Sequence, residues 1–355
     1  MYSKLCGILV ALLAAISHSN LNAQIILADK TDRSVVAFAQ VTDEKGNTIG
    51  MSDMDGCVRI DGKDGQVFVI KHLSYEPKKV KISYPADSDT LWLSPVNYNL
   101  NEVSVSARQL DYIHLKAYFR SYQQNDSCLK YFKDGIVHYY IPLHGRRVKR
   151  HVEASRLLEN KGLIAKDRKR TNSVVDKYIT TPYLEDKTLF ERIKRQADTF
   201  DEGLPYVKLC MDGIPAGICK QDSLTRRVEY DALALEGGKR EGKLFGYTTR
   251  IEAFVQTEIY RWRAEYQSYI DLLNHRDYRK IFYKYKKDKH EQLVEVTDEL
   301  YVLSQAYVIT EEMKRALKEE GSSSKPQEAY WQNPAIPPIH EYLQLVLERE
   351  LLPAE

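Results

Sequence analysis

The stretch LKYFKDGIVHYYI, residues Leu129–Ile141, is rich in aromatic and β-branched residues. Such residues favour strands because their side chains fit a pleated, half-buried surface. Its centre, Asp134-Gly135, is a dipeptide that favours two-residue turns, so we interpret the stretch as a β-hairpin. The same signal extends along the chain, which contains 25 tyrosines. The sequence therefore predicts a mainly β protein.

The composition is that of a globular protein. Hydrophobic residues make up 43% of the 355 residues and charged residues 29%, with 17 Gly and 12 Pro. These values exclude a disordered chain, a collagen-like chain and a multi-span membrane protein, and the length predicts two domains at roughly 150 residues each. The 52 basic and 50 acidic residues give a formal charge of +2, so no overall field selects nucleic acid or an acidic substrate.

Residues 1–23 have the pattern of a secretory signal peptide. Lys4 supplies a positive charge, and Leu5–Ile16 is an apolar run of 12 residues, too short to span a bilayer permanently. The small residue Ala23 precedes the predicted cleavage, which makes Gln24 the first mature residue. We expect export to the periplasm or the outer-membrane periphery, with no transmembrane helix in the mature chain; the alternative is a buried N-terminal helix.

The cysteines bear on anchoring and on disulfides. Cys6 precedes the apolar run, whereas a lipoprotein cysteine follows it, so we expect no lipid anchor. Cys210 and Cys219 flank a turn-rich stretch, and a hairpin there could join them in a disulfide, which an exported protein permits. The alternative is that all four mature cysteines are buried free thiols. Since none has Cys-x-x-Cys spacing, a redox motif or a zinc ribbon is not expected.

Residues 24–107 alternate apolar and polar side chains in short runs separated by turn signals. This pattern is typical of an antiparallel β-sandwich. Val35–Val41 is the first clear strand, and residues 43–47 and 61–65 are predicted turns. Asp53–Gly56 contains the centre of a calcium-binding loop, but Met51 and Gly62 occupy positions that require carboxylates. We therefore predict a turn there.

Four motifs in this region resemble a known domain family. In order, they are Val41-Thr42-Asp43, Ser52–Ile60 (SDMDGCVRI), Leu73-Ser74-Tyr75 and Leu100–Val105 (LNEVSV). Their order and spacing resemble the carboxypeptidase-regulatory-like domain. The resemblance implies a seven-stranded, transthyretin-like sandwich that is common at the start of exported and outer-membrane proteins of Gram-negative bacteria. It also implies an accessory module without catalytic residues.

Residues 108–320 are predicted to form a larger antiparallel β-rich domain with a few helices. The spacing of Leu189, Ile193 and Ala197 predicts an amphipathic helix within residues 185–199. Residues 281–285 and 293–309 are predicted paired strands, followed by a helix that Thr310 caps. Residues 259–273 fit a helix and a strand equally well.

Residues 321–355 are predicted to be a linker and a C-terminal helix. Gly321–Pro326 has the composition of a linker. A helix is expected from Ile339 to Leu351, and Leu343, Val346 and Leu347 form its apolar face.

Known catalytic and cofactor motifs are incomplete. Gly237–Leu244 is close to a phosphate-binding loop, but Leu244 stands where a magnesium-binding Ser or Thr is required. His290-Glu291 and His340-Glu341 lack the second histidine of a zinc protease. The remaining mature histidines have no metal-binding spacing: His72, His114, His138, His144, His151 and His275. We predict no catalytic residue, no metal and no cofactor.

The segment from Arg146 to Arg170 is strongly basic, with ten basic and three acidic residues. A solvated face is the first interpretation. The second is contact with an anionic envelope polymer through Arg146, Arg147, Lys149 and Arg150; export argues against nucleic acid. If strand alternation holds, Arg150 lies on the opposite face from Lys149.

These patterns predict a non-enzymatic periplasmic or envelope-associated binding or assembly protein. Its partner would be an envelope protein or an anionic envelope polymer. Two alternatives stay open. One is a hydrolase whose active-site residues are distant in sequence, and the other is a half-barrel sheet that shelters an acyl chain.

Overall fold

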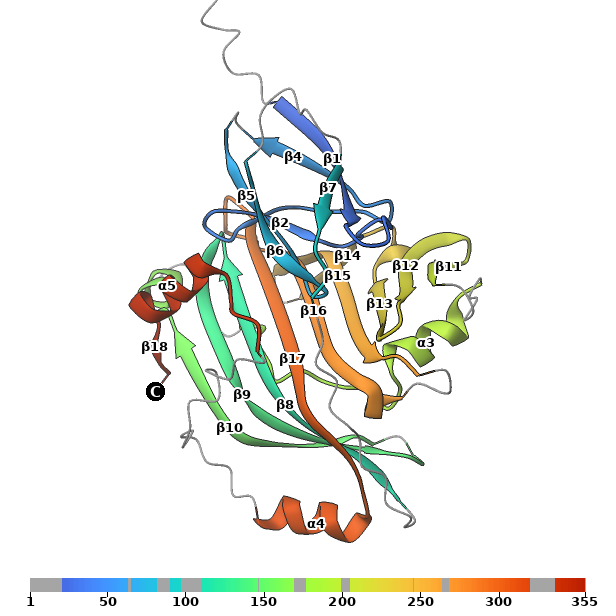
Figure 1. Ribbon diagram of the computed structural model, residues 1–355. Helices are drawn as coiled ribbons and strands as arrows, with labels where there is room; N and C mark the ends of the chain where they lie inside the picture. Colours follow the sequence, from blue (N-terminus) through green and yellow to red (C-terminus); the bar gives the residue numbers. More distant parts are fainter. Residues whose placement is uncertain are drawn as a thin grey trace, which may run out of the picture. The chain divides into compact units, whose positions relative to one another are not determined.

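The computed structural model describes residues 21–62, 65–81, 90–96, 110–145, 147–168, 177–198, 205–244, 246–263, 268–319 and 336–354. The chain divides into two compact units, Met1–Val96 and Asn97–Glu355. Antiparallel sheets dominate both (Figure 1). The predicted mainly β fold class is confirmed.

The first unit is a sandwich of a three-stranded and a four-stranded sheet, with strand orders β4-β1-β7 and β3-β2-β5-β6. Its strands are β1 (Leu21–Asp29), β2 (Gln40–Asp43), β3 (Thr48–Met51), β4 (Cys57–Gly62), β5 (Val67–His72), β6 (Tyr75–Lys81) and β7 (Thr90–Leu93). Leu27 and Ile60 of one sheet share a buried core with Val41 and Phe68 of the other. The core between the sheets is what makes the seven strands one sandwich, as the alternation predicted.

The first strands begin at different residues from those predicted. β2 begins at Gln40 rather than at Val35, because Phe38 adopts a φ of 54°, which breaks the extended chain. β1 begins at Leu21, so the predicted cleavage after Ala23 falls within a strand. The predicted strand at 100–105 lies outside the described residues.

Asp53 forms the turn that its sequence predicted. Its Oδ1 accepts hydrogen bonds from the backbone N–H groups of Asp55 and Cys57, both at 2.9 Å. These bonds occupy the carboxylate within the turn.

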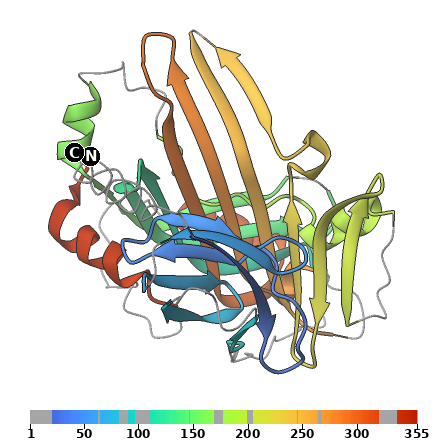
Figure 2. The same cartoon turned by 90° about the horizontal axis from the view of Figure 1, so that it is seen from above.

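The second unit is built on one eleven-stranded antiparallel sheet, with the order β11-β12-β13-β15-β16-β17-β8-β9-β10-β18 and β14 paired to β15. The strands are β8 (Tyr112–Asn125), β9 (Cys128–Pro142), β10 (Lys149–Glu159), β11 (Tyr206–Met211), β12 (Ile214–Gln221), β13 (Thr225–Asp231), β14 (Arg240–Leu244), β15 (Tyr247–Arg261), β16 (Leu272–Tyr285), β17 (Gln292–Val308) and β18 (Leu352–Pro353). Figure 2 shows the long strands β16 and β17 side by side.

The described helices of this unit are α2 (Lys161–Arg168), α3 (Leu189–Gln196), α4 (Thr310–Glu319) and α5 (Glu341–Glu350).

The predicted hairpin at Asp134-Gly135 is wrong, because β9 runs as a single strand of 15 residues through this dipeptide. Gly135 pairs with Phe119 on one side and with Ser155 on the other. A Cβ atom at Gly135 would lie 2.2 Å from the carbonyl oxygen of Ala154. The glycine therefore serves close packing between strands rather than a turn.

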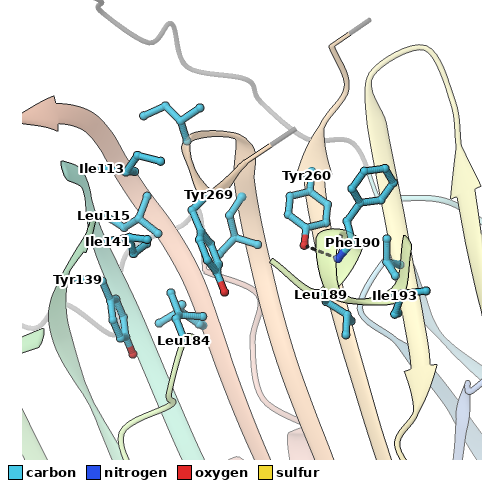
Figure 3. Close-up of a cluster of buried hydrophobic side chains, with 14 of the residues drawn as sticks. Ile113, Leu115, Tyr139, Ile141, Leu184, Leu189, Phe190, Ile193, Tyr260 and Tyr269 are labelled. Atoms are coloured by element: carbon cyan, nitrogen blue, oxygen red, sulfur yellow. Dashed lines mark hydrogen bonds between the residues drawn. The ribbon is translucent and has the colours of Figure 1, made fainter. Parts of the chain in front are cut away.

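One apolar face of the sheet is covered by residues 177–198, termed the crossing segment (Figure 3). Leu184 of this segment and Leu189 of α3 are buried in one cluster with Leu115, Tyr139 and Tyr260 of the sheet. Helix α3 lies within the predicted range 185–199 and ends before Ala197, and Thr188 and Glu191 form a capping box around its first turn.

Helices α4 and α5 lie where helices were predicted, whereas α2 was not predicted. The predicted cap of α4 is wrong: Thr310 is the first residue of the helix, and its hydroxyl donates to Oδ2 of Asp111 at 2.8 Å. Helix α5 buries Leu343, Val346 and Leu347 against Leu129 and Phe132 of β9. The ambiguous stretch 259–273 contains the end of β15, a short 3₁₀ turn at Tyr269–Asp271 and the start of β16. The predicted linker at 321–326 lies outside the described residues. Within the described parts of the chain, no helix is long and apolar enough to cross a membrane.

Candidate functional site

Of the four basic residues predicted to contact an anion, the structure places Lys149 and Arg150 on opposite faces of a sheet. Arg147 is exposed in the chain before β10, and Arg146 lies outside the described residues. Lys149 and Arg150 are consecutive on β10 and pair with Tyr140 and Tyr139 of β9. Their side chains therefore lie on opposite faces of the sheet, as alternation predicted.

Lys149 has contacts on its own face. Its Nζ lies 5.7 Å from the centre of the Tyr112 ring and 3.8 Å from Sδ of Met313 in α4. This amine therefore does not share a surface with Arg150.

Arg150 instead meets Lys133 of β9 at the crossing segment. Arg150 Nη1 donates to the carbonyl oxygens of Thr181 and Pro182, at 3.0 and 3.3 Å. Lys133 Nζ donates to Oγ1 of the same threonine at 3.0 Å. Lys133 and Arg150, termed the cationic pair, thus lie together although 17 positions separate them in the sequence.

The charges of the cationic pair are not matched by acidic groups nearby. Among the described residues, no carboxylate lies within ion-pair distance of either side chain. Lys177 is also close, but its Nζ pairs with Glu159 Oε1 at 3.0 Å. Burial lowers the pKa of the Lys133 amine, and the charges of Arg150 and Lys177 lower it further. Repulsion among these cations is therefore part of the folded state.

The other face of the same strands carries a cluster of histidines that sequence reasoning missed. Nε2 of His114 lies 2.8 Å from Nδ1 of His138, and Nε2 of His138 lies 2.8 Å from Glu153 Oε2. Lys116 Nζ also pairs with Glu153 Oε2 at 2.8 Å, and His151 lies opposite His138 in the register. No metal spacing is present, and only the pairing of β8, β9 and β10 brings these side chains together.

Burial, hydrogen bonds and nearby charges shift the pKa values of Glu153 and His114. Burial raises the pKa of Glu153, but hydrogen bonds from His138 and Lys116 outweigh it and leave the pKa below its usual value. Glu153 Oε2 thus holds both Nε2 of His138 and Nζ of Lys116, and the 2.8 Å contact between Nε2 of His114 and Nδ1 of His138 is a hydrogen bond. Burial, and then the charges of His138 and Lys116, lower the pKa of His114 to about 4. His114 is therefore neutral at pH 7.

A second group of polar side chains, around the single buried histidine His275, holds α3 on the sheet. His275 has Nδ1 3.2 Å from Glu258 Oε1 and Nε2 3.4 Å from Asp277 Oδ1. Burial lowers the pKa of His275, but the charges and hydrogen bonds of Asp277 and Glu258 outweigh burial and raise it to about 10. Glu258 also accepts the N–H of Leu189 at 2.7 Å and the hydroxyl of Tyr260. This glutamate thus links the charged imidazole to the first turn of α3.

Further buried charges fix the chain near the C-terminus. Arg120 pairs through Nε with Glu299, and its Nη1 donates to the carbonyl oxygen of Pro337 at 2.7 Å. Burial raises the pKa of Glu299, but the charges of Arg120 and Arg276 outweigh it and keep the pKa below its usual value. These groups stabilise the fold and face no solvent.

The predicted disulfide between Cys210 and Cys219 is not formed, and both are free thiols. The predicted hairpin is present as β11 and β12, but its register places Cys210 opposite Pro215 and Cys219 opposite Val207. Disulfide-bonded residues need Cα atoms within about 7 Å, and this register offsets the two cysteines along the ladder. Cys128 is exposed, so the alternative of four buried thiols also fails.

The stretch Gly237–Leu244 is a connection between strands. Gly237 and Gly238 have φ values of 68° and 74°, and β14 follows them directly. A strand rather than a helix N-terminus follows the glycines, so the geometry of a phosphate loop is missing. A search of the described residues finds no group of three or more His, Cys, Asp or Glu side chains placed to hold a metal ion.

Comparison with known proteins adds no family. No protein-family model and no curated protein matches the chain. Among solved structures, one described as "Lipid-protein interactions in lipovitellin" aligns with a TM-score of 0.24 and 6% identity, over 61% of this chain and 26% of that one. A likeness this low supports no conclusion on fold or function.

Proposed function

We propose that this chain is an exported, non-enzymatic binding or assembly protein of the periplasm or outer-membrane periphery. The leader-like pattern of residues 1–23 supports export. The first unit would be its accessory domain, of the carboxypeptidase-regulatory-like type. Seven strands in a sandwich are what that resemblance implies, and the first unit has them.

The cationic pair is the observation that carries the binding proposal. Lys133 and Arg150 meet around Thr181 without a described carboxylate. Burial lowers the pKa of Lys133, and repulsion from Arg150 and Lys177 lowers it further. An anionic partner would relieve that repulsion, because an opposite charge nearby favours the charged form of an amine. An anionic envelope component therefore fits this surface better than a neutral one.

The described acid and base groups favour this proposal over a hydrolase. Glu258 and His275 are 1% and 3% exposed, and they hold α3 in place. His138 is hydrogen-bonded to both His114 and Glu153. The pKa of His114 is lowered to about 4, which makes this imidazole a weak base. The acyl-chain alternative needs an open apolar face, and the crossing segment covers this face of the sheet.

Binding to purified envelope material tests the proposal. The protein from its host, with its own N-terminus, is titrated with lipopolysaccharide and with a neutral polysaccharide over a salt series. We expect binding to lipopolysaccharide alone, weakening as salt screens the charges. Absence of binding, or equal binding to the neutral polymer, would contradict the proposal.

Cell fractionation tests the proposed location separately. We expect the chain in the periplasmic or outer-membrane fraction, with Gln24 at its N-terminus. A cytoplasmic chain that retains Met1 would contradict export.

A further inference from the structure

In the cationic pair, Arg150 has N–H donors that no described residue uses. Arg150 uses a single nitrogen, Nη1, for both carbonyl contacts, at 3.0 and 3.3 Å. Its Nε and Nη2 make no hydrogen bond or ion pair with a described residue, and the side chain is exposed. This edge of a guanidinium presents two parallel N–H groups, the arrangement that binds two oxygens of a carboxylate or phosphate at once.

Lys133 supplies a second cation beside this edge. Its amine donates to Thr181 Oγ1 and lies 5.7 Å from the centre of the Phe119 ring. The Lys133 side chain is half-buried. Because Thr181 binds Lys133 through its hydroxyl and Arg150 through its carbonyl oxygen, both cations are tied to one residue. The site is therefore partly pre-organised before any ligand arrives.

The charge balance indicates which anion fits. Carboxylates in this part of the described sheet already have cations: Glu159 pairs with Lys177, and Asp298 with Arg279. The two positive charges of the cationic pair have no carboxylate partner among the residues that the structure describes. A phosphate monoester carries about −1.5 to −2 at pH 7, whereas a carboxylate carries only one charge.

We propose that Lys133 and Arg150 bind a phosphate monoester group, with the Nε–Nη2 edge of Arg150 and the Lys133 amine as donors. This inference rests on the proposed binding function and names its ligand chemistry. Lys177 stands at the margin of the site, where Glu159 pairs with it. A lipid headgroup and a free phosphorylated molecule would both supply the group.

The test uses the full chain with two kinds of probe. Inorganic phosphate, followed by calorimetric titration, is the free form. Phosphatidylcholine vesicles containing phosphatidic acid present a monoester on a membrane, and vesicles with the same fraction of phosphatidylglycerol present a diester. Binding to vesicles is followed by co-sedimentation.

Three variants separate this site from general electrostatics. Arg150→Gln removes the donor edge, and Arg150→Lys keeps the charge but not the edge. Lys149→Gln is the matched control, since it removes the same charge from the adjacent residue on the opposite face. Arg150 is exposed, so these variants should fold, and circular dichroism melting curves check that they do.

We expect Arg150→Gln to weaken binding of the monoester probes about tenfold or more, because a charge-assisted bidentate contact is lost. Arg150→Lys should fall between it and the wild type, and Lys149→Gln should stay within about twofold of the wild type. Binding of free phosphate would support a soluble source, and binding only to phosphatidic acid vesicles a lipid source. Either result supports the site.

Other outcomes would overturn it. Equal losses in Arg150→Gln and Lys149→Gln, or equal binding to monoester and diester vesicles, would show a diffuse positive surface. If the wild type binds lipopolysaccharide but neither monoester probe, the site is refuted and the proposed function stands. If it binds none of them, both are refuted.

Discussion

Nδ1 of His275 lies 3.2 Å from Oε1 of Glu258, and both side chains are buried in the second unit. The same glutamate accepts the N–H of Leu189 at the start of α3. The pairing with Glu258 and Asp277 raises the pKa of His275 to about 10, so this imidazole is charged at neutral pH. The attachment of α3 to the sheet therefore depends on a proton.

Alkaline pH should weaken the second unit through His275. Since the pKa is raised on folding, its stabilisation is complete below the unfolded value of about 6.5 and is lost as pH rises through about 10. Urea unfolding curves at a series of pH values from 7 to above 10 measure the loss. Lysines and tyrosines also titrate there, so the comparison is with His275→Gln, whose curve should be flatter.

The same substitution should be costly at neutral pH. His275→Gln leaves Glu258 and Asp277 without their cation, which costs about 3–5 kcal/mol for a broken buried pair. His290→Gln, at an exposed histidine, is the control and should change stability by less than about 0.5 kcal/mol. Equal stability of the two variants would show that the buried imidazole carries no charge.

Acid should act on His114 in the opposite sense. Its pKa is lowered to about 4, so the stability it contributes is present above about 6.5 and is lost as pH falls toward 4. Because the side chain is half exposed, we expect an effect on the order of 1 kcal/mol or less. Unfolding at pH 7.5 and 4.5 should show a smaller acid loss in His114→Gln than in the wild type, with His144→Gln matching the wild type.

Gly135→Ala should destabilise the sheet strongly. The added Cβ would lie 2.2 Å from the carbonyl oxygen of Ala154 and 2.8 Å from the Phe119 ring, so strands must move apart. Overpacking of this kind costs about 3 kcal/mol. Gly242→Ala on β14 is the control, since nothing lies within 4 Å of its Cβ position, and it should change unfolding by less than about 0.5 kcal/mol. A tolerated alanine at 135 would restore the hairpin interpretation.

The mature protein should contain free thiols at Cys210 and Cys219. Alkylation without reductant followed by peptide mass spectrometry should label both, because the register places them opposite Pro215 and Val207 rather than each other. A cross-linked peptide containing both cysteines would show that the register of β11 and β12 differs.

Local features of this fold could be predicted because short-range periodicity and capping determine them. The spacing of Leu189 and Ile193 identifies α3, and the apolar face of α5 is readable from Leu343 to Leu347, whereas the cap at Thr188 was seen only in the structure. The hairpin predicted at Asp134-Gly135 is wrong because residues distant in the sequence decide the structure there. A turn dipeptide is a local signal, but the need for glycine there comes from Ala154 and Phe119, which are distant in the sequence.

By itself, the sequence determined a mainly β chain with an N-terminal sandwich, because alternation and turn residues act over a few positions. Both side-chain groups that bear on function were decided only by the tertiary structure. Strand register brings His114 to His138 and Glu153, and the crossing segment carries Thr181 to Lys133 and Arg150. Such contacts depend on which strands pair and where the chain returns across the sheet. No periodicity along one segment contains that information, so these sites became visible only once the sheet was assembled.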